Sequence, residues 1–176
     1  MMSIEKNILF DVSKKYGLPV YVYDKNKIIS QYSKLRNAFI KIDNLQINYA
    51  AKALSNINIL NIMKDVGCGI DAVSIQEVEL ALYVGFKTDQ IFYTPSGVEL
   101  SEIKKALKLG VQINIDNISA LKKIAENLSS VKLGIRINPN VRAGGNSKIS
   151  VGDSESKFGL NTSEIQEAKK IISENN

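Results

Sequence analysis

Residues 69–77 read Gly69-Ile70-Asp71-Ala72-Val73-Ser74-Ile75-Gln76-Glu77, a short apolar strand that leads directly into a helix. The run Ile70–Val73 has the β-branched, apolar character of a buried strand. Ser74 and Glu77 have the spacing of a capping box, in which side chains bond free backbone N–H groups where a helix begins. A strand followed at once by a capped helix is one unit of a βα repeat.

The same unit recurs along the centre of the chain. Apolar, β-rich runs begin at residues 47, 70, 91, 111 and 133, which are spaced about 20 to 23 residues apart, and helical patterns fill the gaps between them. The predicted strands are Ile47–Ala51, Ile70–Val73, Ile91–Tyr93, Val111–Ile115 and Leu133–Ile137. This repeat predicts an α/β fold with a parallel sheet.

Helix-end signals support these boundaries. Ser96-x-x-Glu99 repeats the capping box after the third strand, and Asn161-x-x-Glu164 resembles it before the last helix. Gly67, Gly85 and Gly110 stand where three helices end, which is the usual place of a left-handed residue.

Two architectures share this pattern, a doubly wound open sheet and a (β/α)₈ barrel. The G-x-G-x-x-G fingerprint is missing after the first strand, where Ala53-Leu54-Ser55-Asn56 stands, and the chain has no P-loop. The even spacing favours a barrel. Only five strands fit before Asn176, so a barrel would lack three βα units.

Residues 1–40 precede the repeat. They predict a helix at roughly Ile4–Tyr16, a strand at Leu18–Asp24 that lies outside the repeat, and a second helix at about Lys25–Phe39. We therefore divide the chain into 1–40 and 41–176, the latter holding the five βα units. The strand has no evident partner within the 176 residues, so we expect the chain to be part of a larger folding unit.

Composition narrows the classes of function that the protein can have. The chain has one cysteine, Cys68, and no histidine, which excludes a disulfide framework, His-based zinc sites and catalytic triads that use histidine. The net charge is +5, but the lysines are scattered over helical segments, as on solvated helix faces, so we expect no nucleic-acid partner. No apolar run reaches membrane-spanning length and no signal-peptide pattern opens the chain, so we expect a cytoplasmic protein without a membrane partner.

Functional groups of βα repeats gather at the C-terminal ends of the strands. Lys52 follows the first strand, where burial would favour its neutral, nucleophilic form; the alternative is a lysine that marks where the strand emerges into solvent. Asp71 and Arg136 lie inside apolar runs and need partners, in an active site or in a structural ion pair.

The other polar groups at strand ends are Ser74, Thr94, Ser96, Asp116, Asn117, Asn138 and Asn140. Capping explains Ser74 and either Asp116 or Asn117, and turn chemistry explains Thr94.

A long polar stretch follows the fifth strand. It runs from Asn138 to Gly159 and is rich in glycine and serine. Loops of this length in compact domains are usually functional, so the stretch either closes over a site or is a surface insertion.

Five motifs together resemble the fold-type III pyridoxal-phosphate decarboxylases. In chain order they are Pro19-Val20-Tyr21-Val22-Tyr23-Asp24, Tyr49-Ala50-Ala51-Lys52-Ala53, Gly69-Ile70-Asp71-Ala72-Val73-Ser74, Arg136-Ile137-Asn138-Pro139 and Ser156-Lys157-Phe158-Gly159. The last two resemble the diaminopimelate decarboxylase version. The similarity runs from about Tyr16 to the end of the chain.

The resemblance implies a partial TIM barrel of the alanine-racemase-like type, with an opening strand that pairs with a β-domain. It implies that Lys52 holds pyridoxal 5'-phosphate through a Schiff base, and that Asp71 and Arg136 belong to the cofactor pocket. The implied reaction is decarboxylation of meso-diaminopimelate, a small amino-acid substrate, to L-lysine by a homodimer.

The chain also departs from the family pattern. By the resemblance, further cofactor- and substrate-binding residues would lie beyond Asn176, and Gly152-Asp153-Ser154-Glu155 stands where the family usually carries a histidine. We therefore expect the 176 residues alone to be inactive. The alternatives are another fold-type III amino-acid decarboxylase, a racemase, a non-catalytic pyridoxal-phosphate-binding barrel, or a truncated inactive product.

Overall fold

The computed structural model describes residues 4–141 and 158–175. The predicted long loop, including Gly152–Glu155 and the start of the Ser156–Gly159 motif, falls largely outside the described residues. The helices are α1 (Lys6–Tyr16), α2 (Lys25–Ala38), α3 (Ile57–Asp65), α4 (Ile75–Val84), α5 (Leu100–Lys108), α6 (Ile118–Asn127) and α7 (Glu164–Glu174). The strands are β1 (Asn48–Ala50), β2 (Gly69–Ala72), β3 (Ile91–Tyr93), β4 (Gln112–Ile115) and β5 (Leu133–Ile135). Two short 3₁₀ turns, η1 (Ala51–Ala53) and η2 (Thr88–Gln90), complete these elements.

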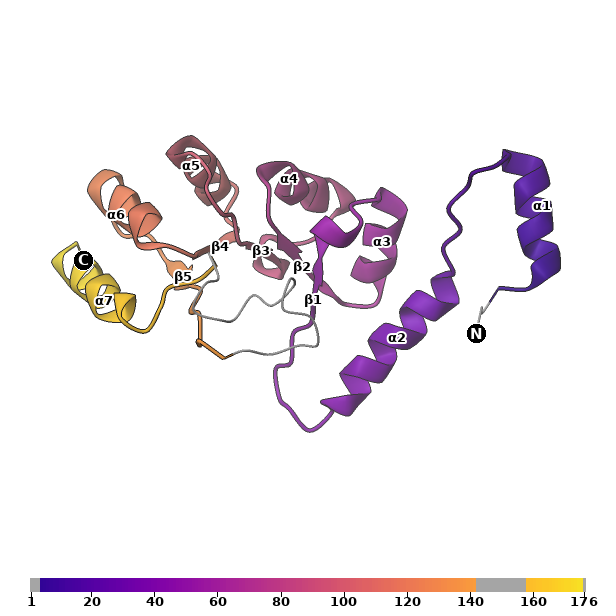
Figure 1. Ribbon diagram of the computed structural model, residues 1–176, viewed down its shortest axis with the longest axis horizontal. Helices are drawn as coiled ribbons and strands as arrows, with labels where there is room; N and C mark the ends of the chain where they lie inside the picture. Colours follow the sequence, from indigo (N-terminus) through magenta and orange to yellow (C-terminus); the bar gives the residue numbers. More distant parts are fainter. Residues whose placement is uncertain (1–3, 142–157, 176) are drawn as a thin grey trace.

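The five strands form one parallel sheet in the order β1-β2-β3-β4-β5. Helices α3 to α7 follow the strands as an arc along one side of the sheet (Figure 1). A doubly wound fold covers both faces of its sheet and reverses its strand order near the centre. Consecutive order with helices on one side is the arrangement of a (β/α)₈ barrel, so the predicted partial barrel of five βα units is confirmed.

Side chains alternate across the sheet, and this alternation creates two different faces. Ile70, Ala72, Ile91, Tyr93 and Ile113 are completely buried in the main core between the sheet and the helices. Their neighbours in sequence, including Asp71 and Asn114, point to the opposite face and are half-buried. Among the described residues no helix of the α3–α7 arc covers that second face, which we call the helix-free face.

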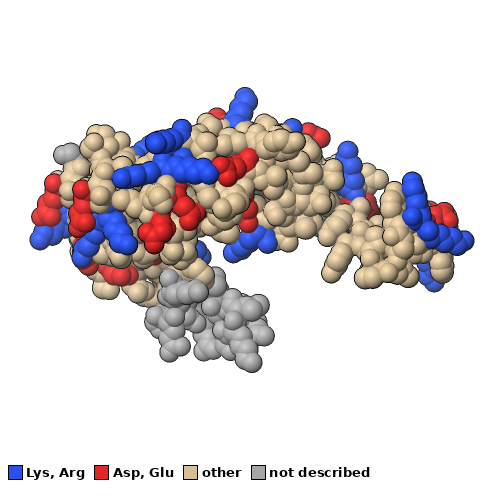
Figure 2. All heavy atoms as spheres, turned by 90° about the horizontal axis from the view of Figure 1, so that it is seen from above, with Lys and Arg blue, Asp and Glu red and all other residues tan. Residues whose placement is uncertain are grey.

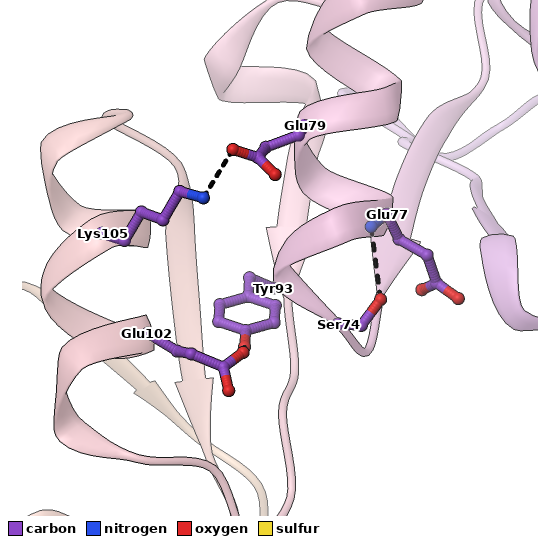
Figure 3. A network of polar contacts seen from close by, with 6 residues as sticks. All are labelled: Ser74, Glu77, Glu79, Tyr93, Glu102 and Lys105. Atoms are coloured by element: carbon purple, nitrogen blue, oxygen red, sulfur yellow. Dashed lines mark hydrogen bonds and ion pairs between the residues drawn. The ribbon is translucent and has the colours of Figure 1, made fainter.

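The predicted caps are confirmed in part. At the start of α4 the Glu77 N–H donates to Ser74 Oγ at 3.2 Å (Figure 3). The Val73 N–H donates to Glu77 Oε2 at 2.8 Å. The capping box at Ser96 is wrong: α5 begins at Leu100 behind Glu99, without a side-chain cap bond. Half of the box at Asn161 forms, since its N–H donates to Glu164 Oε2 (2.7 Å). Gly67, Gly85 and Gly110 all have positive φ, as predicted.

The predicted strand at Leu18–Asp24 is wrong for this chain. The segment is not hydrogen-bonded as a strand, and Tyr21 and Leu18 expose 88% and 78% of their surface. A strand needs a ladder partner, and none of the described residues supplies one. The flanking helices form as predicted, and α1 lies at the far end of the molecule from α7 (Figure 1).

The outer helices carry the charged side chains. Acidic and basic groups are mixed over this side of the molecule (Figure 2), and Lys105 pairs with Glu79 and Lys122 with Glu167, at 2.6 and 2.7 Å. All four side chains are about half exposed. The lysine runs therefore coat solvated helix faces, as the sequence predicts. None of the helices in the described ranges has both the length and the apolar character needed to cross a membrane.

Cys68 lies at the junction of α3 and β2. It is fully buried, and its thiol donates to the Ile47 carbonyl at 3.0 Å. Burial raises the pKa of the Cys68 thiol to about 11, which keeps it protonated and unreactive at neutral pH. Cys68 is therefore a small buried residue of the core rather than a reactive thiol.

Candidate functional site

Lys52 lies in η1, directly after the C-terminal end of β1. Its side chain is exposed, and it forms no ion pair with any residue in the described ranges. The hypothesis of a buried, desolvated lysine is therefore wrong for this chain, because β1 is an edge strand and is only partly buried. The Lys52 amine is accessible to a ligand at the end of the sheet.

Asp71 lies on the neighbouring strand and on the helix-free face. Its register partner on β1 is Ala50, two residues before Lys52. The partner of the Asp71 carboxylate is a hydroxyl rather than a cation, since Thr94 Oγ1 donates to Asp71 Oδ1 at 3.0 Å. The structural ion pair considered from the sequence does not form within the described residues.

Arg136 follows β5 on the same face as Gly134. Its N–H donates to the Ile115 carbonyl at 2.8 Å and extends the ladder by one step. Its guanidinium carbon lies 4.9 Å from the centre of the Phe158 ring, the geometry of a cation–π contact. The aromatic ring thus orients the Arg136 guanidinium.

A second chain segment holds Phe158 in place. Ile137 and Leu160 form a parallel bridge, with the Leu160 N–H donating to the Arg136 carbonyl and the Asn138 N–H donating to the Leu160 carbonyl, both at 2.8 Å. Between them Gly159 adopts φ +83°, and a Cβ there would lie 2.8 Å from Asn138 N. Glycine is required at this position because the two backbones meet.

Three of the predicted site residues therefore share one end of the sheet, and the other candidates have structural roles. Asn117 caps α6 by accepting from the Ala120 N–H at 2.8 Å. Asp116 is buried and accepts from Asn117 Nδ2 at 2.8 Å. Asn138 accepts from the Asn140 N–H at 3.0 Å within the turn after β5. Ser96 is exposed on the β3–α5 connection.

Sequence reasoning missed Asn114 on β4, whose Nδ2 donates to Thr94 Oγ1 at 3.0 Å. It also missed the contact of Phe158 with Arg136. The signal for Asn114 was a polar residue between Ile113 and Ile115, which places it on the face of Asp71. Its hydrogen bond to Thr94 depends on the register between strands, which cannot be read from the sequence alone.

Two cavities lined by described residues lie away from this end. One of about 200 Å³ lies outside the sheet, between the N-terminal parts of α5 and α6. An open, mostly apolar groove of about 590 Å³ runs between α2 and β1. Neither is lined by Lys52, Asp71 or Arg136. Within residues 4–141 and 158–175, these three residues lie on the helix-free face and line neither of these two cavities.

Comparisons with known proteins identify the family that has this sequence pattern and fold. Residues 25–176 match the family model described as pyridoxal-dependent decarboxylase, pyridoxal binding domain. The chain is 36% identical to diaminopimelate decarboxylase of Methanothermobacter thermautotrophicus over 163 residues, which cover 92% of this chain and 38% of that protein. It is 37% identical to the Helicobacter pylori (strain J99) enzyme over 162 residues, covering 89% of this chain and 40% of that protein.

A solved structure agrees with these sequence matches. The chain resembles the crystal structure of Helicobacter pylori diaminopimelate decarboxylase complexed with L-lysine, with a TM-score of 0.85 and 32% identity. The match covers 95% of this chain and 43% of that one. The chain spans about two fifths of the length of the curated relatives it matches. It belongs to the pyridoxal-dependent decarboxylase family, and residues 25–176 correspond to the pyridoxal binding domain of that family.

Proposed function

We propose that the protein containing this chain decarboxylates meso-diaminopimelate to L-lysine, with pyridoxal 5'-phosphate as cofactor and Lys52 as the residue that holds it. The observation that carries the proposal is the position of Lys52, an accessible amine at the C-terminal end of β1, beside a strand that carries Asp71. The identity to diaminopimelate decarboxylases over about nine tenths of the chain supports the substrate. The L-lysine bound in the Helicobacter pylori structure supports the same class of small amino acid.

The residues present fit the cofactor. Its aldehyde needs a primary amine free of competing partners, which Lys52 offers within the described residues, and its anionic oxygens suit a planar guanidinium such as that of Arg136. The bound cofactor withdraws electrons from the substrate carbon that loses carbon dioxide.

Each residue has a separate task in this proposal. With the cofactor bound, Lys52 would hold its aldehyde through the amine and would accept and return protons at Nζ. Arg136 donates to an anionic oxygen and is held against the Phe158 ring. Asp71 presents its carboxylate from β2, the strand next to β1, with Oδ1 fixed by Thr94.

The proposal extends to the organisation of the whole protein. Residues 1–40 form a unit whose exposed apolar segment, Leu18–Asp24, pairs with strands of a separate β-domain, and residues 41–176 form the first five βα units of the barrel. The high exposure of Leu18 and Tyr21 supports this assignment. A homodimer that acts in the cytoplasm is part of the proposal, and the single reduced cysteine, Cys68, is compatible with that compartment.

We further infer that residues 1–176 alone have negligible decarboxylase activity. In the described sheet β1 and β5 each pair on one side only, and the helix-free face is uncovered. Unpaired strand edges and an uncovered face favour association between chains over a closed site.

The test is release of carbon dioxide by the full-length protein loaded with pyridoxal phosphate. We expect turnover of meso-diaminopimelate and little or none of L-ornithine or L-arginine. Lys52→Ala should lower turnover by at least about 10³-fold, because the covalent route is removed. Lys108→Ala, an exposed lysine at the end of α5, is the control and should retain full turnover. Preference for ornithine or arginine would assign a different decarboxylase, and cofactor binding without turnover of any amino acid would assign a non-catalytic protein.

A further inference from the structure

Three polar side chains form a line of hydrogen bonds across the helix-free face. Asn114 Nδ2 on β4 donates to Thr94 Oγ1 at 3.0 Å, and Thr94 Oγ1 donates to Asp71 Oδ1 on β2 at 3.0 Å. Thr94 follows β3, and its N–H donates to the Ala72 carbonyl at 2.8 Å. All three side chains are half-buried. The line therefore connects three adjacent strands and ends on a carboxylate.

The chemistry of the groups sets the direction of this line. An amide nitrogen can only donate, so the Thr94 oxygen accepts from Asn114 and directs its own proton to Asp71. A hydrogen bond to a carboxylate is stronger than one between neutral groups. Asp71 Oδ1 is thereby held in place. Asp71 Oδ2 accepts no hydrogen bond from any residue in the described ranges, so it is available to a ligand.

The neighbouring strand β5 fixes the end of the line at Asn114. Gly134 on β5 pairs with Asn114, and a Cβ at position 134 would overlap Asn114 Oδ1 and lie 3.1 Å from its Cγ. The missing side chain leaves the space that the Asn114 amide occupies. The pairing of β4 with β5 at Gly134 thus fixes the orientation of the Asn114 side chain.

We propose that Thr94 and Asn114 are positioning residues that hold the Asp71 carboxylate toward the cofactor bound at Lys52. The inference rests on the proposed function, because it needs a cofactor at the end of β1. Neither residue needs to touch the cofactor. Their contribution passes through Asp71, so it disappears when Asp71 loses its charge.

The test measures the affinity of the full-length apoprotein for pyridoxal phosphate by absorbance, with thermal unfolding as a check on folding. Thr94→Val keeps the shape and removes the hydroxyl, and we expect an increase in Kd of about tenfold, the order expected for one hydrogen bond to a charged group. Thr94→Ser restores the hydroxyl and should bind within about twofold of the unmodified protein.

A second pair of variants tests the direction in which the hydrogen bonds of the line run. Asn114→Asp replaces the donor to Thr94 with a carboxylate, which can only accept. The Thr94 proton is then shared between two carboxylates, so its hydrogen bond to Asp71 weakens. Gln112→Glu is the matched control, because it adds the same charge two residues earlier on the same strand and face, at an exposed position outside the line. We expect weaker cofactor binding for Asn114→Asp and affinity within about twofold for Gln112→Glu.

A double-mutant cycle decides whether the effect passes through Asp71. Asp71→Asn combined with Thr94→Val should bind no more weakly than Asp71→Asn alone. Full additivity of the two losses, unchanged binding by Thr94→Val, or failure of Thr94→Ser to restore affinity would overturn the inference. A different result would overturn the proposed function: absence of pyridoxal phosphate attached to Lys52 after borohydride reduction of the unmodified protein. The two failures are therefore distinguishable.

Discussion

Gly159→Ala would place a methyl group against backbone atoms at a residue that also has a left-handed conformation. Gly159 has φ +83°, and an alanine Cβ would lie 2.8 Å from Asn138 N and 3.0 Å from the Ile137 carbonyl carbon. The left-handed conformation costs alanine about 1–2 kcal/mol. Forcing a methyl group against backbone that cannot rotate away costs about 1–3 kcal/mol more. We expect a total destabilisation of about 2–5 kcal/mol.

Gly110→Ala separates the two contributions. Gly110 also has positive φ, +75°, but the nearest atom to its Cβ position is Thr88 Cγ2 at 3.9 Å. Only the conformational cost applies there. The measurement is the urea midpoint of the full-length apoprotein with each variant, and the midpoint should fall clearly further for Gly159→Ala.

The same substitution should also weaken cofactor binding. The Leu160 N–H bonds the Arg136 carbonyl at 2.8 Å, so a shift of the backbone at Gly159 moves Arg136 and its contact with Phe158. We expect a higher Kd for pyridoxal phosphate in Gly159→Ala and an unchanged Kd in Gly110→Ala. Equal urea midpoints for the two variants would refute the close approach on which this reasoning depends.

Two further predictions concern the start of α4 and the core between the sheet and the helices. Ser74→Ala should destabilise the protein by about 1 kcal/mol because it removes the cap of α4, whereas Ser96→Ala should change stability by less than about 0.5 kcal/mol since Ser96 caps no helix; paired urea unfolding curves measure both. Burial, with a contribution from Glu102, raises the pKa of Tyr93 from 10.0 to about 12. As pH rises from 10 to 12 the unfolded chain loses this proton before the folded chain does, so stability falls, by about 2 kcal/mol. Tyr93→Phe should remove that alkaline loss, and Tyr83→Phe, at an exposed position, should leave it in place; equal pH profiles for the two variants would contradict the assignment.

The sequence predicted the repeat because strand and helix patterns are local. The strands found in the structure begin within two residues of the predicted starts, and Asp71 lies on the face opposite to that of Ile70 and Ala72, as alternation requires. Two of the wrong predictions concern elements whose formation depends on more than local pattern. The segment Leu18–Asp24 has the pattern of a strand but no strand partner among the described residues. Ser96 has the spacing of a capping box, but α5 begins only at Leu100, after a longer connection.

The candidate site was predictable residue by residue but not as an arrangement. Lys52, Asp71 and Arg136 stand out in sequence because each is a charge within or beside an apolar run. The link from Asn114 through Thr94 to Asp71 depends on the register of three strands whose residues lie 20 and 23 positions apart. Likewise the exposure of Lys52 follows from the edge position of β1, which the strand pattern alone does not determine.

The most direct test of the central claim is borohydride reduction of the full-length protein with pyridoxal phosphate, followed by peptide mapping. Reduction fixes the cofactor to the lysine that holds it, independently of turnover. We predict one labelled peptide, containing Lys52, and loss of that label in Lys52→Ala. A label on a different lysine, or no label under conditions where the cofactor binds, would contradict it.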